Sequence, residues 1–138
     1  MKQSIFFKIG LALFTLLFIF WFWVFAQKGA DIHQGEVYKI LYIHVPNAFS
    51  AFLSSFILFI VSFHLLWRKD VKAMPYAKAT AEIGFIFTIL TLMTGSIWGK
   101  PTWGTWWAWD ARITSMLILA LFYLIYLIAW RINENNDK

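Results

Sequence analysis

The chain has 138 residues, of which 61% are hydrophobic and only 14% carry a formal charge. Soluble domains carry charge on roughly a quarter of their residues, so this composition excludes an ordinary water-soluble domain and indicates that the solvent is lipid. The net charge of +5 is not gathered into a basic stripe, which argues against nucleic-acid binding. The absence of cysteine excludes disulfides and thiolate metal sites.

Four predominantly apolar segments are each long enough to cross a hydrocarbon core of about 30 Å as a helix. They are predicted at residues 9–26, 47–67, 81–98 and 113–130. Helix is the expected form because backbone groups in lipid must pair within their own segment. The first segment is longer than the apolar core of a signal peptide, so we expect a retained anchor. The sequence predicts an all-α membrane protein in which residues 1–138 form a single membrane domain.

Lysine and arginine residues are unequally divided between the two sides of these predicted spans. One side has Lys2, Lys8, Arg68, Lys69, Lys72, Lys78, Arg131 and Lys138. The other side has Lys28, Lys39, Lys100 and Arg112. Cytoplasmic loops are enriched in these residues, so both termini are expected in the cytoplasm. The segment around Lys100 and the loop around His44 then share the outer face of the membrane.

Small residues recur along one face of the third span. Gly84, Thr88, Thr91 and Gly95 follow each other at helical spacing. Such faces allow membrane helices to approach closely, so a packed helix bundle is predicted.

More than half of the chain's nine tryptophans lie in the stretch WGKPTWGTWWAWDARIT. They are Trp98, Trp103, Trp106, Trp107 and Trp109. An aromatic belt at the membrane interface explains isolated tryptophans such as Trp67 and Trp130, but it needs only one or two rings per helix end. If the segment from Trp103 onward is helical, Trp103, Trp106, Trp107 and Asp110 share one face and form a flat apolar shelf. Such a shelf suits a large planar ligand that carries acidic groups, and Gly99, Pro101 and Gly104 are expected to interrupt regular structure beside it.

His44, in the stretch YIHVPNAFS, is expected just outside the outer end of the second span, because Pro46 suits the first turn of a helix. A lone interfacial histidine is usually structural. On the same side as the tryptophan shelf, however, a neutral imidazole is a candidate iron ligand. His64 lies about 30 Å away along the same helix and cannot reach that side.

Three charged residues accompany the shelf, namely Lys100, Asp110 and Arg112. Arg112, together with Lys100, could pair with ligand carboxylates, Arg112 in a bidentate manner, with Asp110 positioning the guanidinium. The alternative is structural: Asp110 pairs internally with Arg112 or Lys100, or the long side chains snorkel to the interface. Near the inner interface, Lys78 and Glu82 are interpreted as an i, i+4 pair.

The stretch WGTWWAWDARIT closely resembles the tryptophan-rich signature of the WWD superfamily of haem-handling membrane proteins. Within that superfamily, KILYIHVPNA and TGSIWGKPTWGTWWAWDARITS resemble the CcmC family of the cytochrome c maturation system. The resemblance extends over essentially the whole chain, with both motifs in the correct order and separation.

The resemblance implies that the tryptophan-rich segment holds a haem, b-type, non-covalent and in transit, with His44 as an axial ligand. It also implies partners: ATP-binding cassette subunits that hydrolyse ATP, a small membrane subunit, and a periplasmic haem chaperone. The chain itself would be a haem-handling subunit and not an enzyme.

The resemblance further implies six spans and a second histidine ligand in a later outer loop. Four spans are predicted here, and no histidine follows His64. Three explanations are open: a companion chain carries the missing spans, the chain is a truncated form, or a partner such as the chaperone fills the second axial position.

Two other functions remain as alternatives. A membrane b-type haem electron-transfer subunit would need facing histidine pairs on two spans. A cofactor-free tetraspan assembly factor would use the tryptophan cluster for stability alone.

Overall fold

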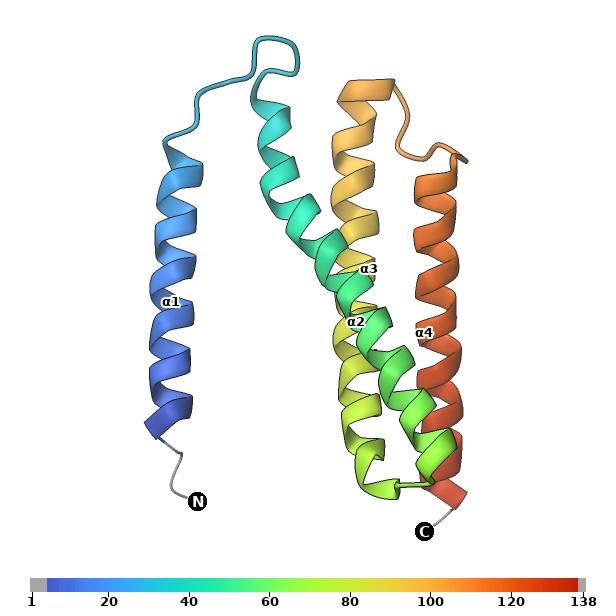
Figure 1. Ribbon diagram of the computed structural model, residues 1–138. Helices are drawn as coiled ribbons and strands as arrows, with labels where there is room; N and C mark the ends of the chain where they lie inside the picture. The colour runs from blue at the N-terminus through green and yellow to red at the C-terminus, as the bar shows by residue number, and fades with distance from the viewer. Residues whose placement is uncertain (1–4, 137–138) are drawn as a thin grey trace. The chain divides into compact units, whose positions relative to one another are not determined.

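The computed structural model describes residues 5–136, and every named element within them is a helix (Figure 1). The long helices are α1 (Ile5–Ala26), α2 (Leu41–Arg68), α3 (Met74–Trp103) and α4 (Ala111–Asn136), and two short 3-10 helices, η1 (Glu36–Ile40) and η2 (Val71–Ala73), precede α2 and α3. Within the described residues, four helices are long and apolar enough to cross a membrane. The prediction of four apolar spanning helices is therefore confirmed. Lys2 and Lys138, used above to predict orientation, lie outside the described residues.

The helices extend beyond the predicted spans. The prediction placed the start of the second span near Asn47, but α2 begins at Leu41, so His44 lies within its first turn and Pro46 lies inside the helix. Similarly, α3 begins at Met74, with Pro75 in its first turn, where a missing N–H costs no helical hydrogen bond. Hydropathy locates only the apolar centre of a span, whereas a helix continues through less apolar residues as long as its backbone remains paired.

Two compact units make up the chain, with the boundary between Lys39 and Ile40. The first unit contains α1 and a tight turn. In this turn the Asp31 side chain accepts hydrogen bonds from the backbone N–H groups of His33, at 2.8 Å, and Gln34, at 2.9 Å. Gly35 follows with a φ of 61°, a conformation that glycine adopts without strain. His33 thus belongs to an exposed local turn.

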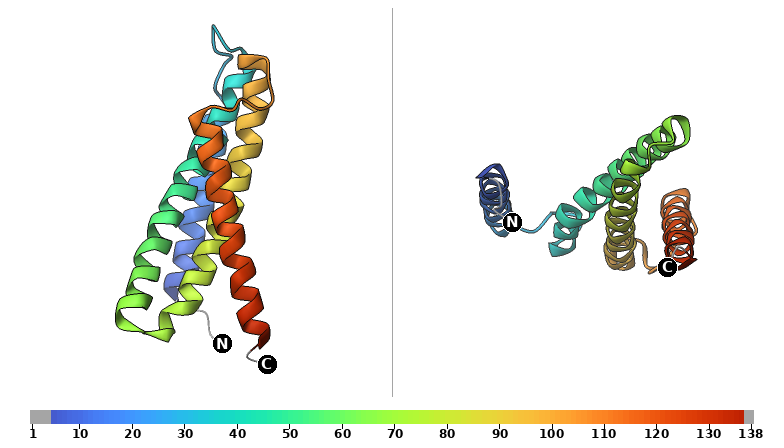
Figure 2. Two further views of the ribbon diagram at one scale, coloured as in Figure 1. Left: turned by 90° about the vertical axis from the view of Figure 1, so that its right-hand side faces the viewer. Right: turned by 90° about the horizontal axis from the view of Figure 1, so that it is seen from below.

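The second unit contains α2, α3 and α4, and α3 packs against both of the others (Figure 2). Small side chains make this approach possible: Ala51 of α2 and Ala77, Ala81 and Thr88 of α3 have no exposed surface. Thr91 is also buried, as expected for the small-residue face of α3.

Tyr123 of α4 connects all three helices of this unit. Its ring lies directly over Gly84 of α3, in the space that a Cβ atom would occupy. Its hydroxyl donates a hydrogen bond of 3.2 Å to the backbone carbonyl of Ala51 in α2.

Near the beginning of α3, the Lys78 ammonium group pairs with the carboxylate of Glu134, near the end of α4, at 3.2 Å. The predicted i, i+4 pair of Lys78 with Glu82 is therefore wrong, because the lysine reaches across to the neighbouring helix.

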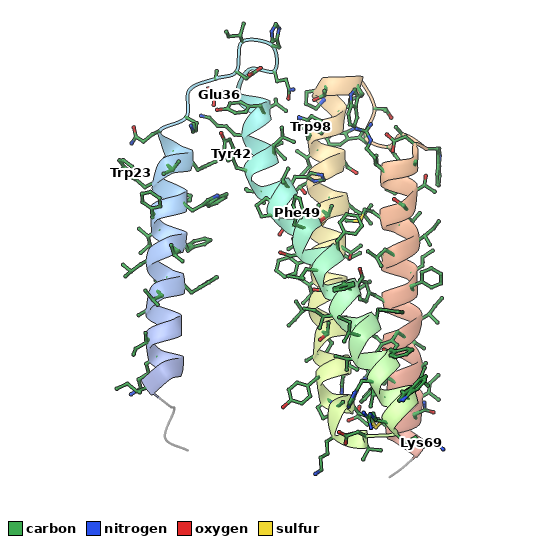
Figure 3. All side chains as sticks on the ribbon, in the orientation of Figure 1. Trp23, Glu36, Tyr42, Phe49, Lys69 and Trp98 are labelled. Atoms are coloured by element: carbon green, nitrogen blue, oxygen red, sulfur yellow. The ribbon has the colours of Figure 1, made fainter. Side chains whose placement is uncertain are left out.

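The three helices alternate in direction, which brings distant sequence segments to one end of the unit (Figure 1). The beginning of α2, the end of α3 and the beginning of α4 meet there. Figure 3 shows Trp98 at this end and Lys69, which caps the other end of α2, at the opposite end.

Candidate functional site

A cavity of about 290 Å³ lies at the end of the unit where α2 and α4 begin and α3 ends. Much of its wall is apolar and includes Ala48, Phe52, Leu92, Ile113 and Met116. Four of the residues nominated from the sequence also line it: His44, Trp98, Trp103 and Arg112. The fold therefore brings an imidazole, two indoles and a guanidinium to one apolar cavity.

His44 is half-buried and held by two consecutive residues of α3. Its Nδ1 atom lies 3.0 Å from the hydroxyl oxygen of Thr94. The Nδ1–Cε1 edge of the ring lies against Gly95, where an added Cβ would be 3.1 Å from the His44 Cε1 atom. This contact leaves almost no space between the ring and the backbone of α3.

The end of α3 is determined by Gly104. This residue has a φ of 79°, in the left-handed region, and its N–H donates to the carbonyl of Lys100 at 3.0 Å. Residues 104–110 are consequently not helical. The expectation that Trp103, Trp106, Trp107 and Asp110 share one helical face is therefore wrong. Gly99 and Pro101 do not interrupt the helix, since both lie within α3.

The five tryptophans do not form a flat shelf. Trp98 and Trp103 meet edge to face, with ring centroids 4.7 Å apart and an interplanar angle of 72°. Trp107 and Trp109 form a second such pair, at 5.5 Å and 71°. Because the two rings of each pair are nearly perpendicular, only one of them can lie flat against a planar ligand. Such pairs are better suited to the wall of a pocket than to a flat binding surface.

Three of these tryptophans are accessible to a ligand or partner. The exposed fraction is 42% for Trp103, 58% for Trp106 and 77% for Trp109. Trp107 is partly covered, and its indole N–H is buried without a hydrogen-bond partner among the described residues. Trp106, Trp107 and Trp109 lie on the connection after α3 and do not belong to the cavity lining described above.

Asp110 has two roles at the beginning of α4. Its Oδ1 atom accepts hydrogen bonds from the backbone N–H groups of Arg112, at 2.9 Å, and Ile113, at 3.0 Å, which makes it the N-cap of the helix. Its Oδ2 atom pairs with the Arg112 guanidinium at 2.7 Å. The Ile113 N–H and the Arg112 side chain hold the pKa of Asp110 below its usual range, so the carboxylate is charged at neutral pH.

Lys100 has a different partner. Its ammonium group donates to the carbonyl of Gly104 at 3.0 Å and thus closes the end of its own helix. Of the two internal pairings considered from the sequence, the structure contains the one between Asp110 and Arg112.

Thr94 and Gly95 were not predicted as site residues. Gly95 belongs to the small-residue face that was recognised in the third span, and this pattern signalled close contact with another helix. Nothing in the sequence pattern pointed to Thr94, because its relation to His44 depends on how α2 and α3 pack together.

Of the side chains that line the cavity, His44 is the one suited to bind a metal ion. In the described part of the chain, no three histidine, cysteine or acidic residues gather to hold an ion. A metal bound at His44 would therefore have to bring most of its donors with it, as iron in a porphyrin does. The indoles and aliphatic side chains around His44 suit such a macrocycle, and Arg112 suits its carboxylates.

Comparison with known sequences identifies the family. The family model described as "Heme exporter protein C" matches residues 1–138. The chain belongs to the heme exporter protein C family. The resemblance noted in the tryptophan-rich and HVP-containing motifs is thus confirmed, and the cavity with its lining lies within the region of the heme exporter protein C match.

Three relatives show the extent of the similarity. Heme exporter protein C of Paracoccus denitrificans is 44% identical over 108 residues, which cover 78% of this chain and 45% of the relative. The protein of the same name from Bradyrhizobium diazoefficiens is 49% identical over 112 residues, covering 78% and 41%. That of Escherichia coli K12 is 40% identical over 123 residues, covering 88% and 50%. The chain thus spans about half the length of the curated relatives it matches.

Proposed function

We propose that this member of the heme exporter protein C family binds haem at the outer face of the bacterial inner membrane and presents it to a periplasmic haem chaperone during maturation of c-type cytochromes. One observation carries the proposal: His44, Trp103 and Arg112, from three different helices, line one apolar cavity. The names of the relatives give the cargo, since each is called a heme exporter protein C.

Each residue has a chemical task in this proposal. His44 supplies an axial nitrogen to the iron. Trp98 and Trp103 bind the macrocycle through apolar and ring contacts. Arg112 neutralises a propionate, for which it is well suited because its side chain remains 70% exposed although it already pairs with Asp110.

The remaining nominated residues lie around this centre. Trp106, Trp107 and Trp109 are on the connection between α3 and α4, and we propose that they cover the part of the haem outside the cavity. We propose that Lys100 adds positive charge beside the site.

The size of the cavity suits a carrier. Pockets that enclose a small-molecule ligand measure about 300–1,000 Å³, and this cavity of about 290 Å³ lies at the lower end. A macrocycle seated here would remain partly outside. Partial enclosure favours release, which a protein that transfers its cargo requires.

The wider assembly follows from the resemblance. Within this assembly, residues 1–138 act as one membrane domain with cytoplasmic termini and an outward-facing tryptophan segment. The chain is a handling subunit without enzymatic activity of its own, and ATP-binding cassette partners with a small membrane subunit supply the energy. The haem is b-type and non-covalent.

The proposal is tested by isolating the chain in detergent, adding haem and recording the absorption spectrum. The wild type should bind haem with the bands of a histidine-ligated iron, and His44→Ala should lose them. His64→Ala is the matched control, because His64 lies near the other end of α2, 3.9 Å from Asp70. The axial role of His44 is wrong if its alanine variant keeps the spectrum and haem content of the wild type.

A further inference from the structure

We infer that Thr94 is a positioning residue for His44, which it holds as the neutral tautomer with the proton on Nδ1 and the lone pair on Nε2. The inference rests on the proposed function in one respect, namely that the Nε2 lone pair is the group that binds iron.

The argument begins with the single proton of the Thr94 hydroxyl. The hydroxyl lies 2.7 Å from the carbonyl oxygen of Leu90, one turn earlier in α3. A carbonyl can only accept, so the hydroxyl donates its proton there. A second carbonyl, that of Thr91, lies 3.3 Å away and also can only accept.

With its proton committed, the Thr94 oxygen can only accept from the imidazole. The His44 Nδ1 atom lies 3.0 Å from this oxygen, a normal length for an N–H···O hydrogen bond. The proton of the neutral ring is therefore on Nδ1, and Nε2 is left with a free lone pair. This is the protonation state that a metal-binding imidazole needs, since the nitrogen that does not bind the metal usually donates to a fixed acceptor.

The chain of hydrogen bonds from His44 through Thr94 to Leu90 is cooperative. A hydroxyl that donates is a better acceptor, and the effect is larger in surroundings of low polarity. Gly95, the next residue, allows the ring to reach this position, because any Cβ there would lie only 3.1 Å from Cε1. Thr94 thus sets the rotation of the ring, and Gly95 permits its distance from α3.

The Thr94 hydroxyl, as the hydrogen-bond acceptor for His44, also suits a protein that binds haem and then releases it. A carboxylate in this position would give the imidazole strong anionic character and strengthen its bond to iron. A neutral hydroxyl orients the ring while increasing its basicity much less. The geometry therefore favours a well-directed ligand that remains exchangeable.

The test reads the tautomer directly in the haem-free protein. The full chain, labelled with ¹⁵N-histidine, is examined in detergent micelles at pH 8 by long-range proton–nitrogen correlation. His44 is assigned by comparison with His44→Gln. The wild type should show a protonated Nδ1 and an unprotonated Nε2. A proton on Nε2 in the wild type would overturn the inference whatever the variants do.

Variants then show whether Thr94 is the cause. Thr94→Val should convert His44 to a mixture of tautomers, and Thr94→Ser should restore the wild-type state. Thr102→Val is the matched control, because Thr102 makes the same backbone hydrogen bond, 2.8 Å to the carbonyl of Trp98, without contacting His44. An unchanged tautomer in Thr94→Val would remove Thr94 from the role even if that variant is less stable.

A haem titration separates this inference from the proposed function. Thr94→Val should weaken haem binding by about tenfold, the lower end of the usual effect of losing such a partner. If the wild type binds no haem, the proposed function fails, and the tautomer experiment still decides the role of Thr94. If haem binds normally to Thr94→Val, positioning by Thr94 is not needed for binding, and the inference fails alone.

Discussion

The guanidinium carbon of Arg112 lies 4.7 Å from the centroid of the Trp103 ring. Trp103 precedes the connection 104–110 in the sequence and Arg112 follows it. Their contact therefore joins the end of α3 to the beginning of α4. Asp110 holds the same guanidinium through its Oδ2 atom, 2.7 Å from Nη2 and 3.2 Å from Nε. Exposed ion pairs add little to stability, so this arrangement matters mainly because it orients Arg112 along the cavity wall.

The first prediction concerns the carboxylates of the ligand. Arg112→Ala should release haem more rapidly than the wild type, because a propionate loses its cationic partner. Arg112→Lys should restore only part of the retention, since lysine keeps the charge but not the planar, two-pronged donor geometry. The measurement is the rate of haem transfer to a soluble haem-scavenging protein.

Haem dimethyl ester provides the control for this prediction, because it has the same ring without charged propionates. Its release rate should be the same from the wild type and from Arg112→Ala. If both ligands are released faster from the variant, Arg112 acts on the shape of the pocket and not on the carboxylates.

The second prediction separates the two roles of Asp110. Asp110→Ser keeps a side-chain acceptor for the N-terminus of α4 but loses the pairing with Arg112, whereas Asp110→Ala loses both. The serine variant should therefore match the wild type in thermal stability but release haem faster, and the alanine variant should be impaired in both. Equal stability of the alanine variant and the wild type would show that the cap is unimportant.

The pH dependence of this site follows from the lowered pKa of Asp110. A carboxyl group whose pKa is lower in the folded than in the unfolded protein contributes stability above its unfolded value, about 3.9, and loses it as the pH falls through the folded value. The stability difference between the wild type and Asp110→Ala should thus be constant from pH 7 to pH 5 and shrink only at more acidic pH.

The third prediction concerns the packing of the three-helix unit. Gly84→Ala should destabilise the protein by about 1–3 kcal/mol or more, because its Cβ would overlap the Tyr123 ring. Gly10→Ala is the matched control, since no atom lies within 4 Å of its added Cβ. Thermal unfolding in one detergent measures both variants.

A compensating change tests the same contact from its other side. Adding Tyr123→Leu to Gly84→Ala should recover part of the lost stability by removing the ring that clashes. No recovery would mean that Gly84 is required for another reason, such as the path of the α3 backbone.

The fourth prediction concerns orientation in the membrane. The chain has no cysteine, so single cysteines can be introduced without background labelling. Thr102→Cys, near the tryptophan segment, should react with a membrane-impermeant thiol reagent added to intact spheroplasts. Lys72→Cys, in η2 at the other end of the unit, should react only after the membrane is opened. The reverse pattern would exclude presentation of haem on the outer face.

Much of the fold could be predicted because its signals are local. Apolar runs of sufficient length predicted four spanning helices, and these were found. The spacing of Gly84, Thr88 and Thr91 predicted the face of α3 that packs closely, since one helical period is enough to define a face. The two long motifs correctly indicated the family, because each is a continuous run of neighbouring residues.

Other features depended on one backbone conformation. The tryptophan segment was interpreted as a possible helix with a shared face, but Gly104 adopts a φ of 79° and ends α3 at Trp103. Gly99 and Pro101 looked equally disruptive in the sequence yet are accommodated within the helix. Composition identifies residues that can stop a helix, and only the surrounding structure decides which of them does.

The sequence by itself determined the number of long helices, the concentration of indoles and charges after the third of them, and the family. Only the tertiary structure decided that Lys78 pairs with Glu134, that His44 lies inside α2, and that Thr94 faces its ring. The physical reason is the distance along the sequence over which each signal acts. Hydropathy and helical periodicity act within a few turns of one segment. A hydrogen bond between residues fifty positions apart, such as that of His44 with Thr94, exists only once two helices have packed in a particular register.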